Sequence, residues 1–81
     1  MPNAVIVVTT PTGAPQRMLF GDDEFVVTDM PTRLEDIFSP THPLPVDGWR
    51  FQGTDATGRS WVFDVRLDHR DQRWYLLRQW D

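Results

Sequence analysis

The chain has 81 residues, a formal net charge of −4, 40% hydrophobic and 12% aromatic residues, and no cysteine. This length suits one domain, residues 1–81, and the composition is typical of a globular rather than a disordered chain. The absence of cysteine excludes disulfide bonds and thiolate metal sites, and no apolar run approaches the length of a membrane-spanning helix.

The first part of the chain predicts three strands. Ala4–Thr10 (AVIVVTT) is a β-branched run of the kind that favours extended structure. Arg17–Phe20 and Glu24–Met30 are two further strands, and Gly21–Asp23 between them suits a tight hairpin turn. We expect these three strands to form a meander.

A short helix is expected after the third strand. Thr32 and Glu35 have the spacing of a capping box, in which each side chain bonds the other residue's backbone amide. Ser39–Pro40 ends the helix, because the residue before a proline avoids the helical conformation. The proline-rich stretch up to Asp47 is expected to be a stiff connection back to the sheet. The apolar residues of the helix are expected to cover one open end of a barrel: Leu34, Ile37 and Phe38.

The second part of the chain predicts three more strands. They are Gly48–Gly53, Trp61–Leu67 and Arg73–Trp80, and the polar turn Asp68–Gln72 joins the last two. Because Arg73–Trp80 is apolar on both sides, its inward face is left open, and so is whether Trp80 is core or exposed. In the strand before it, alternation directs four residues inward: Trp61, Phe63, Val65 and Leu67.

These elements predict a mainly β fold. We expect a small antiparallel β-barrel or curved meander of about six strands, with one short helix between the third and fourth strands. The start of the chain lacks the basic segment of a secretory signal, so a cytoplasmic protein without membrane contact is expected. The oligomeric state is left open.

The sequence contains no recognisable catalytic set. His42 and His69 lie far apart in predicted loops, and no cysteine is available to complete a zinc site. Ser39 and Ser60 are not in a nucleophile-elbow sequence. The carboxylates of Asp22 and Asp23 fall in a turn, where they stay solvated, whereas acid–base catalysis needs a carboxylate in a buried position. We therefore expect no enzymatic activity, no metal and no cofactor.

Binding is the better interpretation of the charged and aromatic residues. Asp64 is expected to pair across strands with Arg50 or Arg78. A continuous arginine stripe would favour single-stranded nucleic acid, whereas arginines interleaved with Asp64 and Asp68 would favour a protein partner. The negative net charge disfavours nucleic acid, so a protein partner is expected. The candidate binding surface consists of Arg50, Arg66, Tyr75 and Arg78.

Both ends of the chain resemble a family of uncharacterised small bacterial domains. The resemblance lies in RMLFGDDEFVV (residues 17–27) and WVFDVRLDHRDQRWYLLRQWD (residues 61–81), and it does not cover the proline-rich middle. The family is common in high-GC bacteria, and some members are appended to Y-family polymerase-like proteins of mutagenic repair. It implies a β fold, a non-enzymatic role and, as an alternative function, a nucleic-acid accessory in DNA repair. Asp22 and Asp23 stand where the family usually has basic residues, which counts against DNA contact.

Overall fold

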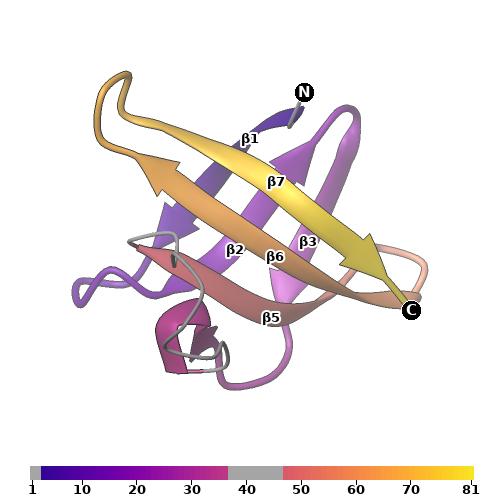
Figure 1. The fold of residues 1–81 in the computed structure, drawn as a ribbon. Coiled ribbons are helices and arrows are strands. Elements are labelled where there is room, and N and C mark those ends of the chain that lie inside the picture. Colours follow the sequence, from indigo (N-terminus) through magenta and orange to yellow (C-terminus); the bar gives the residue numbers. More distant parts are fainter. Residues whose placement is uncertain (1–2, 37–46) are drawn as a thin grey trace.

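The computed structural model describes residues 3–36 and 47–81. Six strands close into an antiparallel barrel, and a short seventh strand, β4 (Thr32–Arg33), pairs with β5 beside the ring (Figure 1). The small antiparallel barrel expected from the sequence is therefore confirmed. The barrel strands are β1 (Asn3–Thr9), β2 (Pro15–Phe20), β3 (Asp23–Val27), β5 (Gly48–Thr54), β6 (Ser60–Asp68) and β7 (Arg73–Trp80).

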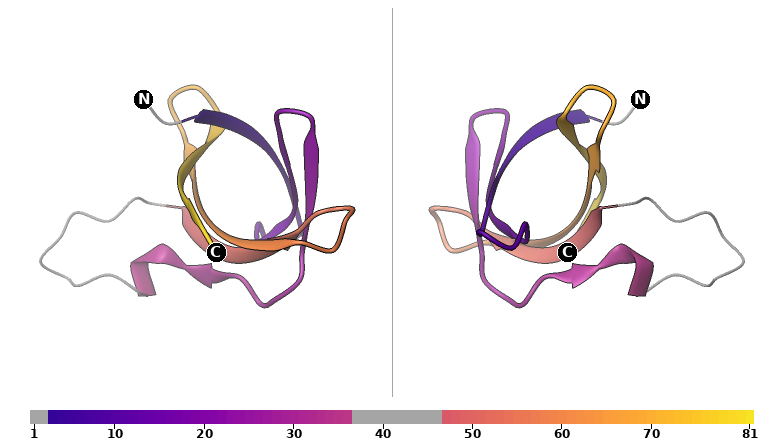
Figure 2. Two further views of the ribbon diagram at one scale, coloured as in Figure 1. Left: turned by 90° about the vertical axis from the view of Figure 1, so that its right-hand side faces the viewer. Right: turned by 90° about the vertical axis from the view of Figure 1, so that its left-hand side faces the viewer.

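The barrel is a continuous meander. β1, β2 and β3 pair in sequence as expected, β3 pairs with β5, and β5, β6 and β7 follow in order. The ring closes where β7 pairs with β1, and the end-on views of Figure 2 show this closure. A closed barrel satisfies the backbone groups that an open sheet would leave at its edges.

The junction between β3 and β5 is short and is extended by a side chain. Only Val26 and Val27 of β3 pair with β5. Beyond them the Thr28 amide donates to the carbonyl of Gln52 at 2.9 Å, and the Gln52 amide donates to Oδ1 of Asp29 at 2.8 Å. The Asp29 carboxylate thus continues the hydrogen-bond ladder along β5 beyond the end of β3.

The core consists of side chains that alternate into the ring. Phe63 and Val65 are fully buried, as the alternation in β6 predicts, whereas Trp61 and Leu67 at the ends of that run are only partly buried. The rings of Phe25 and Trp61 form a T-shaped contact with centroids 5.6 Å apart, and the centroids of Phe25 and Phe63 are 4.9 Å apart. The buried core comprises Val5, Met18, Phe25, Trp49, Phe51, Phe63, Val65 and Leu76.

A β-bulge decides which side chains of β7 point outward. Val65 of β6 pairs with Leu76 and Asp64 pairs with Arg78, so Leu77 is an extra residue between the two pairs. Before the bulge, Leu76 points into the core; after it, the alternation is reversed. Arg78 and Trp80 therefore lie on the outside with Tyr75, and Trp80 is a half-buried surface residue rather than a core residue.

The predicted short helix is not found in the described part of the chain. Thr32 does not cap a helix: it belongs to β4 and pairs with Arg50, and Leu34–Asp36 forms one 3₁₀ turn. Pairing with the edge of β5 satisfies the extended backbone here and overrides the local helix signal. Leu34 is fully buried, but against Gly48 and outside the core cluster. Ile37, Phe38 and the proline-rich connection lie outside the described residues.

The described ranges contain no helix that is long and apolar enough to cross a membrane.

Candidate arginine-rich binding surface

The outer surface of β5, β6 and β7 carries three cross-strand rows of side chains. The first row is Arg50–Asp64–Arg78, with Asp64 directly opposite an arginine on each neighbouring strand. The second row places Arg66 opposite Tyr75, and the third places Val62 opposite Trp80. We call this surface the arginine face and define it by Arg50, Asp64, Arg66, Tyr75, Arg78 and Trp80.

The arginine face is built around a buried carboxylate. Asp64 is 3% exposed, although it points away from the core. Arg50 binds both of its oxygens: Nε donates to Oδ1 at 2.8 Å and Nη2 donates to Oδ2 at 3.0 Å. The side-chain hydrogen bond to Asp64 is the main cause that raises the pKa of Arg50. This bidentate pair confirms the expected cross-strand partnership and fixes the guanidinium plane.

Two guanidinium groups of the same surface lie over the ring of Trp80. The Cζ atoms of Arg50 and Arg78 are 4.7 Å and 4.6 Å from the centroid of the Trp80 ring. Both distances are within the range of cation–π attraction, which is strongest over tryptophan. The indole therefore positions both arginines, and Arg50 is held by the ring as well as by Asp64.

A second aromatic contact lies at the other end of the arginine face. The guanidinium of Arg66 lies 6.0 Å from the ring centroid of Tyr75 and 3.7 Å from Oδ2 of Asp68. The Tyr75 hydroxyl donates a hydrogen bond to the carboxylate of Asp71 in the β6–β7 turn. This bond is the main cause that raises the pKa of Tyr75 and lowers the pKa of Asp71.

The structure brings all four sequence-predicted binding residues onto one face. Arg50, Arg66 and Tyr75 alternate with core residues of their strands, so the period of two placed them correctly. Arg78 reaches the face only because of the bulge at Leu77. The sequence left open whether Trp80 is core or exposed, since a bulge has no reliable signal in a single sequence, and the structure places it on this surface.

The charges of the arginine face are interleaved rather than of one sign. Asp64 separates Arg50 from Arg78, and Asp68 lies beside Arg66. Arg78 has no carboxylate within ion-pair distance among the described residues. Its guanidinium is thus the one in the Arg50–Asp64–Arg78 row that is available to a ligand.

The histidines and carboxylates considered for chemistry in the sequence lie apart from one another in the described residues. No group of three or more histidine, cysteine, aspartate or glutamate residues in ranges 3–36 and 47–81 could hold a metal ion. His69 contacts the carboxylate of Asp47 in an exposed position, and His42 lies outside the described residues. Asp64 is the only buried charged side chain in these ranges, and Arg50 occupies both of its oxygens.

Comparison with protein-family models, with curated proteins and with solved structures found no match for the chain.

Proposed function

We propose that this protein is a non-catalytic interaction module that binds a protein partner through the arginine face. The observation that carries this proposal is the alternation of charge in the row Arg50–Asp64–Arg78. Such a row suits a surface of mixed charge, as proteins present, better than a uniformly negative backbone. Tryptophan, tyrosine and arginine are also the residues that concentrate the binding energy of protein interfaces.

The arginine face is held in place before any partner arrives. Trp80 is flanked by two guanidiniums, and Asp64 fixes one of them through two hydrogen bonds. Long arginine side chains lose much conformational freedom when a partner immobilises them. Holding them in the free protein reduces that loss, so the arrangement favours binding without rearrangement.

A second candidate function is a single-stranded nucleic-acid accessory linked to DNA repair. Such proteins use aromatic rings to stack bases and neighbouring arginines to contact phosphates, and the partly exposed rings of Tyr75 and Trp80 lie next to arginines. The resemblance to repair-associated domains favours the same function. The net charge of −4 and the carboxylate of Asp64 count against this function, because both repel the phosphates of a nucleic acid.

The proposed function is tested by affinity capture with matched charge variants from an extract of the native cells. Arg78→Glu reverses the free guanidinium of the face, and Arg70→Glu makes the same change in net charge in the β6–β7 turn, where the side chain is 92% exposed. We expect one partner to be retained by the wild type and by Arg70→Glu and lost by Arg78→Glu. A partner retained equally by all three proteins would show that the arginine face is not the binding surface.

The nucleic-acid alternative is tested by an amide NMR titration with a short mixed-sequence single-stranded DNA at low salt. If the chain binds single strands, shifts will cluster on β5–β7 and disappear as salt rises, because counterion release drives such binding. We expect no clustered shifts, since the face is charge-balanced. Salt-sensitive shifts that Arg78→Glu abolishes would replace the protein-partner proposal with the nucleic-acid one.

A further inference from the structure

The closure between β1 and β7 is only half formed. Asn3, Ala4 and Val5 pair with β7, whereas Ile6–Thr9 pair with β2 alone among the described residues. After Val5, β1 diverges from the start of β7. The backbone of Ile6–Thr9 therefore has one side without a strand partner in the part of the chain that the structure describes.

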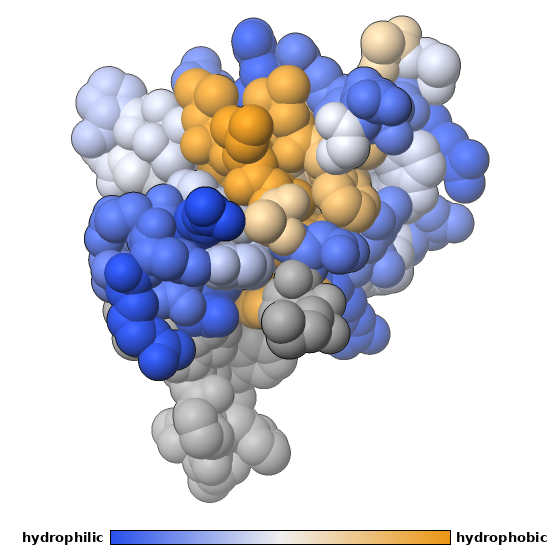
Figure 3. All heavy atoms as spheres, turned by 90° about the horizontal axis from the view of Figure 1, so that it is seen from above, coloured by the Kyte–Doolittle hydropathy of each residue, from blue (hydrophilic) through white to orange (hydrophobic). Residues whose placement is uncertain are grey.

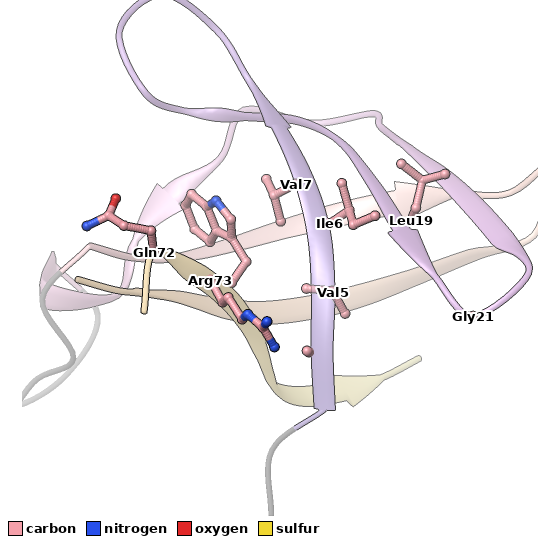
Figure 4. A pocket seen from close by; sticks show the side chains of 9 residues that line it. Val5, Ile6, Val7, Leu19, Gly21, Gln72 and Arg73 are labelled. Atoms are coloured by element: carbon pink, nitrogen blue, oxygen red, sulfur yellow. The ribbon is translucent and has the colours of Figure 1, made fainter. Parts of the chain in front are cut away.

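A hollow of about 520 Å³ lies across β1 where the two strands separate. Figure 4 shows Gln72 and Arg73 on one side of β1 and Leu19 and Gly21 on the other. A second hollow of about 280 Å³ continues along the mouth of the barrel, and Val7 and Trp74 line both of them. The two hollows thus form a depression that follows the unpaired side of β1.

Trp74 differs from the other tryptophans in what covers its ring. Arginine guanidiniums stack on Trp49, Trp61 and Trp80 at 4.5 to 4.7 Å from the ring centroids. No arginine of ranges 3–36 and 47–81 stacks on Trp74, which packs against the core on one side and lines both hollows. An indole in this position is an apolar surface that a ligand side chain can cover.

The depression is apolar along β1, with Arg73 at the rim of the first hollow and both Arg33 and Asp47 lining the second. Ile6 is 64% exposed on the outside of β1, and hydrophobic side chains gather in one patch on the face seen from above in Figure 3. Arg73 stands at the rim, and no carboxylate of the described residues lies within ion-pair distance of it. An occupant that complements this surface is apolar where it meets β1 and negatively charged beside Arg73.

We propose that the open side of β1 binds an extended segment of another protein, in which apolar residues alternate with an acidic residue. The segment adds a short strand beside Ile6–Thr9, so that its backbone bonds the amide and carbonyl groups that β7 leaves unpaired. Alternate side chains of a strand point to opposite faces. One apolar side chain therefore covers Trp74 and Val7, and a carboxylate reaches Arg73. This inference goes beyond the proposed function, because it concerns a different surface and does not depend on the arginine face.

The test is selection of ligands for the full chain from a displayed library of random short peptides. We expect enriched peptides to combine alternating apolar residues with an acidic residue. Their affinity should fall about tenfold in Arg73→Glu, which reverses the rim charge, and also in Ile6→Glu, which places a charge on the apolar surface. Arg70→Glu makes the same charge change in the adjoining β6–β7 turn and should bind like the wild type.

Amide hydrogen exchange gives a readout that side-chain docking would not produce. The enriched peptide should slow exchange at those amides of Ile6–Thr9 that point away from β2, since strand addition gives them new hydrogen bonds. Both binding variants alter exposed side chains, and an unchanged amide spectrum away from the substitution will show that they are folded. Failure to enrich any peptide, binding that Arg78→Glu rather than Arg73→Glu weakens, or binding without slower exchange in β1 would each overturn the proposal.

Discussion

Gly53 of β5 lies directly against the ring of Phe63 on β6. A Cβ atom at Gly53 would come to 2.8 Å from Cε2 of Phe63 and 3.1 Å from Cβ of Phe25, closer than unstrained packing allows. Both phenylalanines are buried and belong to the core cluster. The aromatic core thus fills the barrel up to the backbone of β5, and only glycine leaves enough room at this position.

We therefore expect Gly53→Ala to destabilise the protein although it adds a single methyl group. Overpacking of a filled core costs about 1–3 kcal/mol. Urea denaturation of the variant should show a lower midpoint with an unchanged slope. Gln52→Ala, at the neighbouring outward position, is the control and should change the midpoint little. Equal midpoints for wild type and Gly53→Ala would show that the Phe63 ring can move aside.

Phe63 and Trp61 lie on the same side of β6 but should differ in their contribution to stability. Phe63 is fully buried, so Phe63→Ala is expected to cost about 3–5 kcal/mol. A domain of this size has roughly 5 kcal/mol in total, so this variant should be largely unfolded. Trp61 is half-buried, with Phe25 in a T-shaped contact and Arg59 over its ring.

Because Trp61 is only partly buried, Trp61→Ala should cost about 2 kcal/mol and leave a folded majority. Thermal unfolding followed by circular dichroism distinguishes the two variants. If Trp61→Ala unfolded the chain as completely as Phe63→Ala, the tryptophan would have to be a core residue.

Asp64→Asn should destabilise the protein because Arg50 loses the charged partner of its two hydrogen bonds. The amide keeps the shape of the carboxylate but loses its charge and one acceptor for Arg50. Hydrogen bonds to charged groups contribute about 1.5–3 kcal/mol each, so a loss of about 2 kcal/mol is expected.

The control for this prediction is Glu24→Gln. It removes a carboxylate from an exposed ion pair with Arg17, at 3.4 Å, and pairs of that kind add little to stability. Comparison of the two variants by urea denaturation checks the prediction. If Asp64→Asn lowered the free energy of unfolding no more than Glu24→Gln does, the buried Arg50–Asp64 pair would stabilise the protein no more than an exposed ion pair.

The ionisation of Tyr75 should occur at a higher pH than that of an ordinary tyrosine. The Asp71 carboxylate accepts its hydroxyl hydrogen bond, which raises the pKa of Tyr75 in the folded state. The stabilisation that results is complete below the unfolded value of about 10 and is lost as pH rises through the folded pKa. Tyr75 is the only tyrosine in the chain, so the ultraviolet absorbance of its phenolate reports this residue alone.

Replacement of Asp71 provides the control for Tyr75. Asp71→Asn removes the charged acceptor and should move the tyrosine titration toward its ordinary range, whereas Asp55→Asn, in a different turn, should not. Identical titrations for the wild type and Asp71→Asn would contradict the hydrogen bond.

The alternation of apolar and polar residues was enough to predict most of the barrel. The period of two in β5 and β6 placed Phe51, Phe63 and Val65 inside and Arg50 outside, because a strand repeats every second residue whatever its neighbours are. The sequence also predicted the turn at Gly21. This residue has a φ of 61°, a conformation that other residues rarely adopt.

Two features depended on contacts between strands distant in sequence. The capping-box pattern at Thr32 predicted a helix, but the free edge of β5 was available to pair with this segment as β4. The bulge at Leu77 is visible only when β6 and β7 are aligned side by side. Local propensities describe a segment in isolation, whereas pairing depends on which edge the fold presents to it.

The sequence by itself determined a small β protein, the inward residues of its regular strands and the outward positions of Arg50, Arg66 and Tyr75. Only the tertiary structure decided that Trp80 joins that surface, that Asp64 is buried beneath Arg50, and that β1 separates from β7 after Val5. The physical reason is that side-chain alternation is a local property of an extended backbone. Register, bulges and the closure of a barrel are set by the packing of all its strands together.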